Sequence, residues 1–351
     1  MATPSGILDR DIYYIIPDRH PRADTAAEYY GIDLTGFQDS LVEHGFTIQD
    51  QARANYPRTA QSLSATWYME YLPDLFEDEP ADTASLDPFY QMLLRNPLGE
   101  VMTDAGAEYV HIGSWWWPTA TATTATTVFD RKVPNEFTSV WRATTGLRWL
   151  TAANAEEGMD RRQERYQIAR AQLAELERVA ALPHDQPRFV MAHLTVPHPP
   201  MVFAADGSYV TEATQRSRTA AENLQEQVTF IDTWLADFVD QVVTGDEATD
   251  PIIVIQSDEG PNPPSLIRGD TYTDYADIDI DGRREKLATF SAWYLPGIDE
   301  DPPSDITGVN TWRFILDHYL GTDYGLLEDR VFVYPSNDNF YEFEEVTDDF
   351  D

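Results

Sequence analysis

Short apolar runs alternate along this chain with longer segments of helical periodicity, and this alternation predicts an α/β fold, a three-layer sandwich around a mainly parallel central sheet. The run IIVI at 252–255 is continuous, as in a strand buried on both faces of a parallel sheet. No segment has the composition of an interdomain linker. Residues 1–351 are therefore expected to form one domain, with a frayed acidic tail at about 341–351.

The strands are predicted from short apolar runs that end in turn or polar residues. They lie at residues 11–17, 108–117, where the strand runs into an aromatic loop, 188–196, 252–255 and 287–295. The helices are predicted from apolar residues three and four positions apart, with glycine or proline where the pattern stops. They lie at residues 35–46, from 59 onward, 89–94, 160–182, 217–243 and 310–320. Residues 262–282 are expected to form a long loop over the site described next.

Acidic side chains follow two of the predicted strands directly. Asp18 follows the first strand, and Asp258 and Glu259 follow the apolar run at 252–255. Because open α/β sheets bind ligands at the carboxyl ends of their strands, these acids are expected to converge on one rim. Two carboxylates about 4 Å apart repel by on the order of 4 kcal/mol at an effective dielectric constant of about 20, and a divalent cation reverses that sign. The alternative is a strand that ends in a solvated acidic loop.

A threonine and two histidines near the same predicted rim have chemical and structural interpretations. Thr59, at the start of a helix, is either a cap or a nucleophile assisted by the helix dipole and a metal ion. His198 lies between two prolines, and its restricted backbone suits a histidine held toward a ligand. His193 lies inside a predicted strand, where a lone histidine is usually structural.

The segment HIGSWWWPT at 111–119 carries three consecutive tryptophans. These rings either cover an edge of the core or form the wall of a pocket for an apolar or sugar-like group. The following stretch TATATTATT, at 119–127, consists of small residues and is expected to be a mobile loop.

The charge balance excludes some partners. The chain has 61 acidic and 24 basic residues, a formal net charge of -37, and only two lysines, Lys132 and Lys286. Such a surface repels nucleic acid and anionic lipid. An acidic excess with almost no lysine predicts a halophilic protein, because concentrated salt screens the repulsion. The absence of cysteine excludes disulfides, thiolate metal sites and a cysteine nucleophile.

Neither a signal peptide nor an apolar run of membrane-spanning length is present in the sequence. The expected localisation has two alternatives. It is extracytoplasmic if the chain is a domain excised from a membrane-anchored parent, and cytoplasmic if the chain is native as written.

Six stretches, taken in order, resemble the sulfatase-like hydrolase family of the alkaline phosphatase superfamily, in the branch that includes lipoteichoic acid synthase and phosphoethanolamine transferase domains. They are DIYYIIPDRHPRAD, GFQDSLVEHGFTIQDQARANYPRTAQSLSA, YVHIGSWW, FVMAHLTVPHPPMVF, IIVIQSDEGP and NTWRFILDHYLGTDYGLLEDR. They span most of the chain, and their shared order is more specific than any one of them. The resemblance implies the alkaline-phosphatase-like form of the α/β fold.

The resemblance also implies roles for single residues. In that family an acid after the first strand, a Thr or Ser nucleophile and an Asp-His pair after a late strand bind the catalytic metal. Asp18, Thr59 and Asp258 match these positions. His198 is similar to the family's histidine that holds the phosphoryl group or protonates the leaving oxygen. The residues expected on the substrate side are His111, Trp115 and His193.

One position departs from the family pattern, because this chain has SDEG where SDHG is usual and Glu259 stands at the place of a metal-binding histidine. Either Glu259 is a ligand, or the site is weakened and the protein is a degenerate relative. We predict a ligand role. The predicted ligand set is Asp18, Thr59, Asp258 and Glu259. An all-oxygen set favours one Mn²⁺, Mg²⁺ or Ca²⁺ ion over Zn²⁺.

The resemblance favours phosphoryl over sulfuryl chemistry. Sulfatases of the superfamily make formylglycine from Cys or Ser in a Cys/Ser-x-Pro-x-Arg signature, whereas Thr59 precedes Ala60 and Gln61 and cannot become that aldehyde. The prediction is a metal-dependent phosphohydrolase, phosphodiesterase or phospho-group transferase that forms a phospho-threonine on a small-molecule, lipid or glycan phosphoester. The alternatives are a non-catalytic domain that binds a glycan or lipid headgroup and a structural domain stabilised by Ca²⁺.

Overall fold

The computed structural model describes residues 6–129, 161–264, 267–268, 271–272, 275 and 278–350. Seven of its strands form one mixed sheet in the order β2-β9-β6-β1-β5-β3-β4. Their bounds are β1 (Ile12–Pro17), β2 (Thr47–Ile48), β3 (Glu108–Ile112), β4 (Thr127–Phe129), β5 (Arg188–Leu194), β6 (Ile252–Gln256) and β9 (Ser291–Tyr294).

The centre of the sheet is parallel, as the sequence predicts. β1 pairs in parallel with β5 and β6, and β3 pairs in parallel with β5 and β4. β9 is antiparallel to both β6 and β2. Ile12 lies opposite both Phe189 and Ile252, so β1, β5 and β6 start level with one another. Their carboxyl ends therefore meet at one edge of the sheet.

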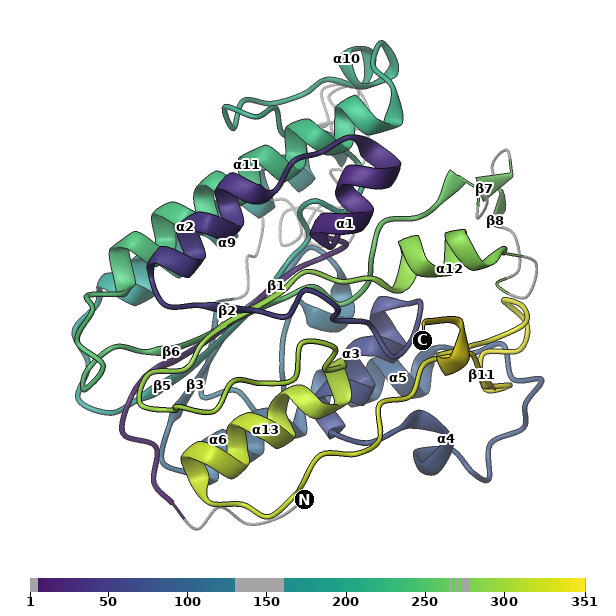
Figure 1. The fold of residues 1–351 in the computed structure, drawn as a ribbon. Helices are drawn as coiled ribbons and strands as arrows, with labels where there is room; N and C mark the ends of the chain where they lie inside the picture. Colours follow the sequence, from purple (N-terminus) through teal and green to yellow (C-terminus); the bar gives the residue numbers. More distant parts are fainter. Residues whose placement is uncertain are drawn as a thin grey trace, which may run out of the picture.

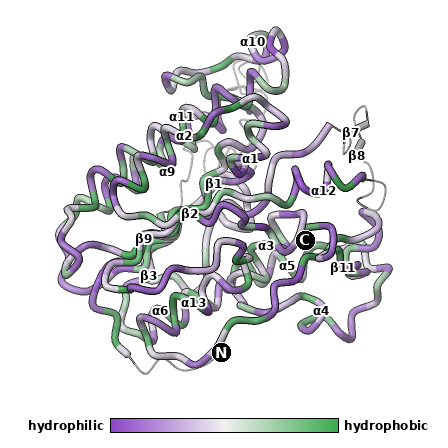
Figure 2. Tube along the Cα trace, in the orientation of Figure 1, coloured by the Kyte–Doolittle hydropathy of each residue, from purple (hydrophilic) through white to green (hydrophobic). Residues whose placement is uncertain are grey.

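Helices cover both faces of the sheet and complete the predicted three layers (Figure 1). One layer contains α2 (Thr35–Glu43), α9 (Arg161–Ala181) and α11 (Ala220–Val242). The other contains α3 (Thr59–Tyr68), α5 (Asp87–Arg95), α6 (Pro97–Asp104) and α13 (Gly308–Leu320). Along these helices hydrophilic and hydrophobic residues alternate, as expected when one side faces the sheet (Figure 2).

Alternate residues of β1 enter different cores. Tyr13 and Ile15 pack in a cluster with Leu235 of α11, whereas Tyr14 and Ile16 pack in a cluster with Trp312 of α13. This is the two-residue period of a strand buried on both faces.

Shorter elements connect these layers. They are α1 (Ala23–Thr25), the π-helix η1 (Ala26–Tyr30), α4 (Leu72–Leu75), η2 (Trp117–Thr119), α10 (Glu212–Arg216), β7 (Ile267–Arg268), β8 (Thr271–Tyr272), α12 (Ile280–Leu287), β10 (Phe332–Val333), β11 (Glu344–Glu345) and η6 (Thr347–Phe350). Within the described residues no helix is both long and apolar enough to cross a membrane.

Three segments differ from the sequence prediction. The last sheet strand begins at Ser291 and not at Leu287, because α12 extends to Leu287. The predicted frayed tail instead packs on the body: β11 pairs with β10, and Val346 is buried. Within the predicted loop at 262–282, β7 and β8 form an antiparallel pair and α12 begins at Ile280, while residues 265–266, 269–270, 273–274 and 276–277 lie outside the described residues.

Candidate active site

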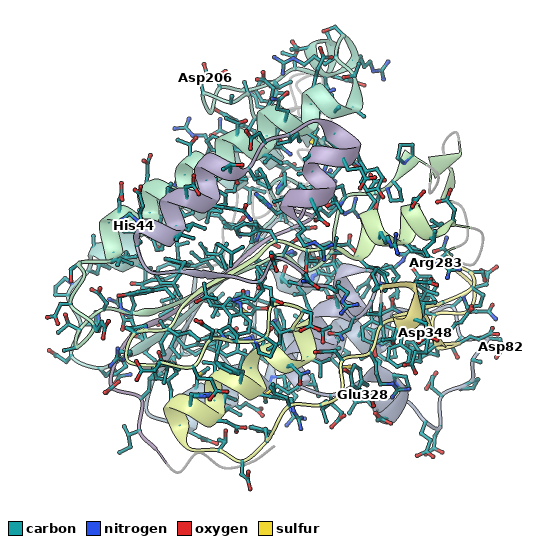
Figure 3. All side chains as sticks on the ribbon, viewed as in Figure 1. His44, Asp82, Asp206, Arg283, Glu328 and Asp348 are labelled. Atoms are coloured by element: carbon teal, nitrogen blue, oxygen red, sulfur yellow. The ribbon has the colours of Figure 1, made fainter. Side chains whose placement is uncertain are left out.

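Three buried side chains from neighbouring strands meet at the carboxyl edge of the sheet. Asp18 follows β1, His193 is near the end of β5, and Asp258 follows β6. One potential ligand atom from each lies within 4.8 Å of the other two. Acids such as Asp82 and Asp206, by contrast, lie at the periphery of the molecule (Figure 3). The predicted convergence of Asp18 and Asp258 on one rim is thus present, with His193 beside them.

The atoms at this edge fit a divalent cation. Asp18 Oδ1, His193 Nε2 and Asp258 Oδ2 are buried and have no hydrogen-bond partner. Buried polar groups in proteins usually have partners, so three such atoms in one place fit a bound cation. Two carboxylates and an imidazole are suitable ligands for Mn²⁺ or Zn²⁺.

The two aspartates have opposite pKa shifts. Burial by itself would raise the pKa of Asp18, but His198, His193 and Arg19 together hold it well below its usual range. Burial, followed by the charges of Asp18 and Glu259, raises the pKa of Asp258 to about 7. The site therefore resists carrying two unneutralised carboxylates, which is the electrostatic condition that a cation relieves.

Thr59 is the first residue of α3, and the N-terminus of this helix lies at the same edge of the sheet. Arg58 is the N-cap, with extended backbone and no side-chain cap, so the capping role considered for Thr59 is absent. Ser62, one turn later, donates its hydroxyl to the carbonyl oxygen of Asp258 at 2.6 Å. The Thr59 hydroxyl is itself one of the groups that lower the pKa of Asp258. Thr59 and Asp258 are thus held side by side by the first turn of α3.

A cavity of about 180 Å³ opens over these residues. Its charged, hydroxyl and aromatic lining includes Asp18, Arg19, Arg58, Thr59, Trp115, His198 and Glu259. Thr59 and His198, the predicted catalytic pair, therefore face the same space. Two guanidinium groups beside a hydroxyl suit an anionic substrate such as a phosphoester.

His198 is neutral at physiological pH. Burial is the main cause that lowers its pKa to about 4. Its Nδ1 is hydrogen-bonded to the carbonyl oxygen of Pro199, which can only accept, so Nδ1 carries the hydrogen. The lone pair of the neutral ring is then on Nε2.

Glu259 makes contacts that the sequence did not predict. Its Oε1 accepts from Arg19 Nε at 2.7 Å and from Lys286 Nζ at 2.9 Å, and its side chain is 1% exposed. Its Oε2 is buried without a partner. Among the described residues the group able to surround a cation contains His193 and does not contain Glu259. The ligand role of Glu259 stays a prediction.

The backbone explains how the two cations reach Glu259. Arg19 is in the left-handed region, with φ of 64°, and its N–H donates to Asp258 Oδ1 at 3.2 Å. A Cβ at Gly260 would lie 2.3 Å from the carbonyl oxygen of Glu285, so only glycine lets the loop after β6 approach the end of α12 this closely. That approach places Lys286 against Glu259.

The residues predicted on the substrate side lie in different surroundings. Trp115 lines the cavity, with its ring 5.8 Å from that of His198. His111 does not line it: Nδ1 accepts from the Tyr109 hydroxyl at 3.0 Å, and Nε2 donates to the Thr119 carbonyl at 2.9 Å. His193 belongs to the cation-binding group described above. Substrate contact by each of the three stays a prediction.

Several residues at the site were not predicted. Thr119, assigned to a mobile loop, is instead the fully buried end of η2, where its hydroxyl contacts His193. A low-complexity composition gives no signal for that contact. Arg19, Arg58 and Lys286 were also missed as site residues. Lys286 had a signal, because a rare lysine in a chain of net charge -37 is a candidate for a specific buried role.

The fold and the site define the class of protein, an α/β protein of the alkaline phosphatase superfamily with a strand-end acidic centre. More particularly, the chain belongs to the sulfatase family, whose model matches residues 10–282. This confirms the resemblance found in the sequence. No curated protein sequence matches the chain.

Solved structures with a similar fold include the C-terminal periplasmic domain of EcEptC from Escherichia coli, at 13% identity, a TM-score of 0.58, and coverage of 97% of this chain and 93% of that one. That domain has also been solved in complex with Zn. The C-terminal periplasmic domain of phosphoethanolamine transferase EptC from Campylobacter jejuni is 11% identical, with a TM-score of 0.56 and coverage of 90% and 91%.

A third similar structure is the phosphonate monoester hydrolase of Agrobacterium radiobacter, at 12% identity and a TM-score of 0.53, covering 92% of this chain and 80% of that one. At these identities the likeness concerns the fold. It confirms the predicted alkaline-phosphatase-like α/β sandwich.

Proposed function

We propose that this protein is a metal-dependent hydrolase or transferase of phosphate esters, with Thr59 as nucleophile and a phospho-threonine intermediate. The observation that carries the proposal is the position of Thr59, at the first residue of α3, in one cavity with Asp18, His198 and two guanidinium groups. A hydroxyl at a helix N-terminus is close to the positive end of the helix dipole, which favours its alkoxide.

The protein groups account for the charge and the protons of the first step. Arg19 and Arg58 bind and orient the anionic phosphoryl group. His198 Nε2, which carries a lone pair, accepts the hydroxyl proton of Thr59. The Thr59 Oγ–P bond forms as the bond from phosphorus to the leaving oxygen breaks in line with it, and the proton on His198 then passes to that oxygen.

In the second step His198 is neutral again and accepts a proton from water or from an acceptor alcohol. The oxygen of that molecule forms a bond to phosphorus as the phosphorus–Oγ bond of Thr59 breaks, and the proton on His198 passes to Thr59 Oγ, which restores the hydroxyl and the neutral imidazole. Water gives a hydrolase and an alcohol gives a transferase. Similar folds occur in a phosphoethanolamine transferase and in a phosphonate monoester hydrolase, which supports chemistry at phosphorus and either outcome.

Asp18, Asp258 and the Thr59 hydroxyl are the proposed holders of one divalent cation, with Glu259 as the further ligand predicted from the sequence. When bound, the cation would supply charge stabilisation to the phosphoryl oxygens and lower the pKa of the Thr59 hydroxyl. The predicted all-oxygen set favours Mn²⁺, Mg²⁺ or Ca²⁺. A set containing His193 shifts the preference toward Mn²⁺ or Zn²⁺.

The proposed substrates are small-molecule, lipid or glycan phosphoesters rather than nucleic acids, because a chain of net charge -37 repels polyanions. The acidic composition further supports the proposal that the protein works in concentrated salt. Assays therefore belong in high salt.

The test is turnover of bis-p-nitrophenyl phosphate with Mn²⁺ by wild type, Thr59→Ala and Thr59→Ser. Thr59→Ala should lower kcat by at least about 10³-fold while still binding Mn²⁺, and Thr59→Ser should keep part of the activity. Acid-quenched wild type should carry one phosphoryl group on the peptide containing Thr59. Unchanged turnover in Thr59→Ala would remove the nucleophile assignment. Metal binding without turnover in wild type would favour the non-catalytic alternative.

A further inference from the structure

A line of hydroxyl groups connects the tryptophan segment to His193. His193 Nδ1 lies 2.9 Å from Thr119 Oγ1, which lies 2.7 Å from Ser114 Oγ. Ser114 Oγ donates to the carbonyl oxygen of Trp116 at 3.1 Å. Ser114, Thr119 and His193 are all buried. The line therefore runs through buried residues from the backbone of the HIGSWWWPT segment to the imidazole.

Hydrogens can be placed along this line so that each has an acceptor. His193 Nδ1–H donates to Thr119, the Thr119 hydroxyl donates to Ser114, and the Ser114 hydroxyl donates to the Trp116 carbonyl, which only accepts. In that arrangement the lone pair of His193 is on Nε2. The opposite arrangement puts a hydrogen on Nε2, where the nearest carboxylate oxygen, Asp18 Oδ2, is 3.4 Å away, longer than a charge-assisted hydrogen bond.

The Nε2 side of the ring faces the acidic edge. His193 Nε2 lies 3.4 Å from Asp18 Oδ2 but makes no well-formed hydrogen bond, and Asp18 Oδ1 and Asp258 Oδ2 make none either. The three residues are the ones whose ligand atoms lie within 4.8 Å of one another. A histidine that ligates a metal characteristically donates its other ring N–H to a fixed acceptor, and Thr119 Oγ1 is such an acceptor.

Glu259, in contrast, has its charge balanced by the protein. Arg19 and Lys286 both donate to its Oε1. Lys286 Nζ also donates to the carbonyl oxygen of Gly260 at 3.1 Å and to Asn262 Oδ1 at 2.8 Å, so its three hydrogens are all used. Turning this carboxylate toward a cation would leave two buried positive charges without their shared partner.

We propose that His193, through Nε2, takes the place of Glu259 as protein ligand of the divalent cation, and that Thr119 and Ser114 are positioning residues that hold its lone pair toward the ion. The inference rests on the proposed function only in that it concerns the same cation. It gives the tryptophan segment a role in building the site. His111, whose Nε2 donates to the Thr119 carbonyl, fixes that segment from β3.

The experiment uses Mn²⁺ alone as probe, with no substrate, on the full chain in high salt. Pulsed electron paramagnetic resonance of the Mn²⁺-loaded protein should show coupling to a histidine nitrogen in wild type. The coupling should persist in Glu259→Gln and be absent in His193→Gln. Calorimetric titration should show Mn²⁺ affinity reduced by at least about 100-fold in His193→Gln, with Glu259→Gln binding more tightly than that variant.

The positioning role has its own matched pair of variants. Thr119→Val removes the hydroxyl at nearly constant shape and should weaken Mn²⁺ binding by about 10- to 100-fold, the usual effect of losing an outer partner of a metal ligand. Thr119→Ser restores the hydroxyl and should restore the affinity. Circular dichroism in metal-free buffer checks that each variant is folded.

The inference is overturned if the nitrogen coupling survives in His193→Gln, or if wild type binds no Mn²⁺. It is equally overturned if Glu259→Gln loses Mn²⁺ while His193→Gln keeps it. Equal weakening by Thr119→Val and Thr119→Ser removes the positioning role. Because none of these readouts involves turnover, a failure of Thr59 as nucleophile would leave the result intact, and the reverse also holds.

Discussion

The acidic edge of the sheet has two sides, the loop after β6 with Glu259 and the end of β5 with His193, and they differ in how much positive charge the protein places beside them. On the β6 side, Glu259 is neutralised by two protein cations, Arg19 and Lys286. On the β5 side, His193 Nδ1 contacts the neutral hydroxyl of Thr119, and Nε2 lies 3.4 Å from Asp18 Oδ2 without a well-formed hydrogen bond. A sequence motif thus marks where a ligand can stand, whereas the charges around that position decide whether the protein already neutralises it.

The largest effect should come from breaking the neutralised side. Lys286→Met keeps the aliphatic stem and removes one of the two charges on Glu259, which is 1% exposed in its side chain. We expect a loss of about 3 to 5 kcal/mol in the free energy of unfolding, the usual result of removing one partner from a buried pair. Urea denaturation in metal-free buffer measures it.

A matched control for that variant is Arg95→Met, which removes an exposed pair with Glu100 at 3.4 Å. It should leave the urea midpoint almost unchanged. Equal midpoint shifts in the two variants would show that the contact between Lys286 and Glu259 is not special.

The second effect sharpens the comparison by loading the site. At a free Mn²⁺ concentration of about 100 times Kd, the folded state should gain about 3 kcal/mol, because the ion binds the folded chain only. Addition of EDTA should reverse the gain. In Asp18→Asn, which lacks one carboxylate of the cation-binding group, the same Mn²⁺ concentration should give a much smaller gain; an undiminished gain would place the ion elsewhere.

The third effect concerns the support of the His193 side. Burial lowers the pKa of His111 from 6.5 to about 4, so below pH 6.5 the unfolded chain takes up a proton that the folded chain does not. The stability from neutral His111 is complete above pH 6.5 and is lost as pH falls toward 4. Between pH 7 and pH 5 the loss is about 2 kcal/mol.

His111→Gln isolates this term, because glutamine keeps an amide that can donate to the Thr119 carbonyl but does not titrate. The variant should lose less stability than wild type between pH 7 and pH 5, by that same amount. Chemical denaturation at several pH values gives both curves. Parallel curves would contradict the assignment.

The smallest effect is expected where the two sides meet at α3. Ser62→Ala deletes the hydrogen bond to the Asp258 carbonyl and should cost about 1 kcal/mol in stability, with a severalfold fall in kcat as Thr59 loses its fixed position. Ser64→Ala, on the same helix, deletes a hydrogen bond to the Phe89 carbonyl and should leave kcat unchanged. A fall in kcat of equal size in both variants would indicate a general effect of loosening α3.

The sequence predicted the parts of this molecule that depend on local pattern. The continuous apolar runs of β1 and β6 predict strands that are buried along their whole length, and both strands are buried in this way. The acids that follow them lie at one edge of the sheet because the two strands run in the same direction. α12 was missed because IDGRREKL has no apolar stripe. Its position depends on the close approach at Gly260, a tertiary contact that the residues of α12 do not encode.

The site was predicted in the same uneven way. Asp18 and Asp258 could be placed because two adjacent parallel strands end in acid. The contact between Thr119 and His193 joins residues 74 positions apart, through a hydroxyl in a run of threonine and alanine that offers no distinctive pattern. The ion pairs of Glu259 with Arg19 and Lys286 form only when three separate segments of the chain come together. The sequence therefore predicts the position of Glu259 but not its partners.

The rarity of lysine gives the chain a built-in chemical reporter. Lys286 is 1% exposed and surrounds its ammonium with three oxygen acceptors, so acylating reagents should not reach it while α12 stays docked on the loop after β6. Each modification of Lys286 then records one opening of that contact. The rate of labelling, followed by mass spectrometry, would measure how often this contact opens in the native protein.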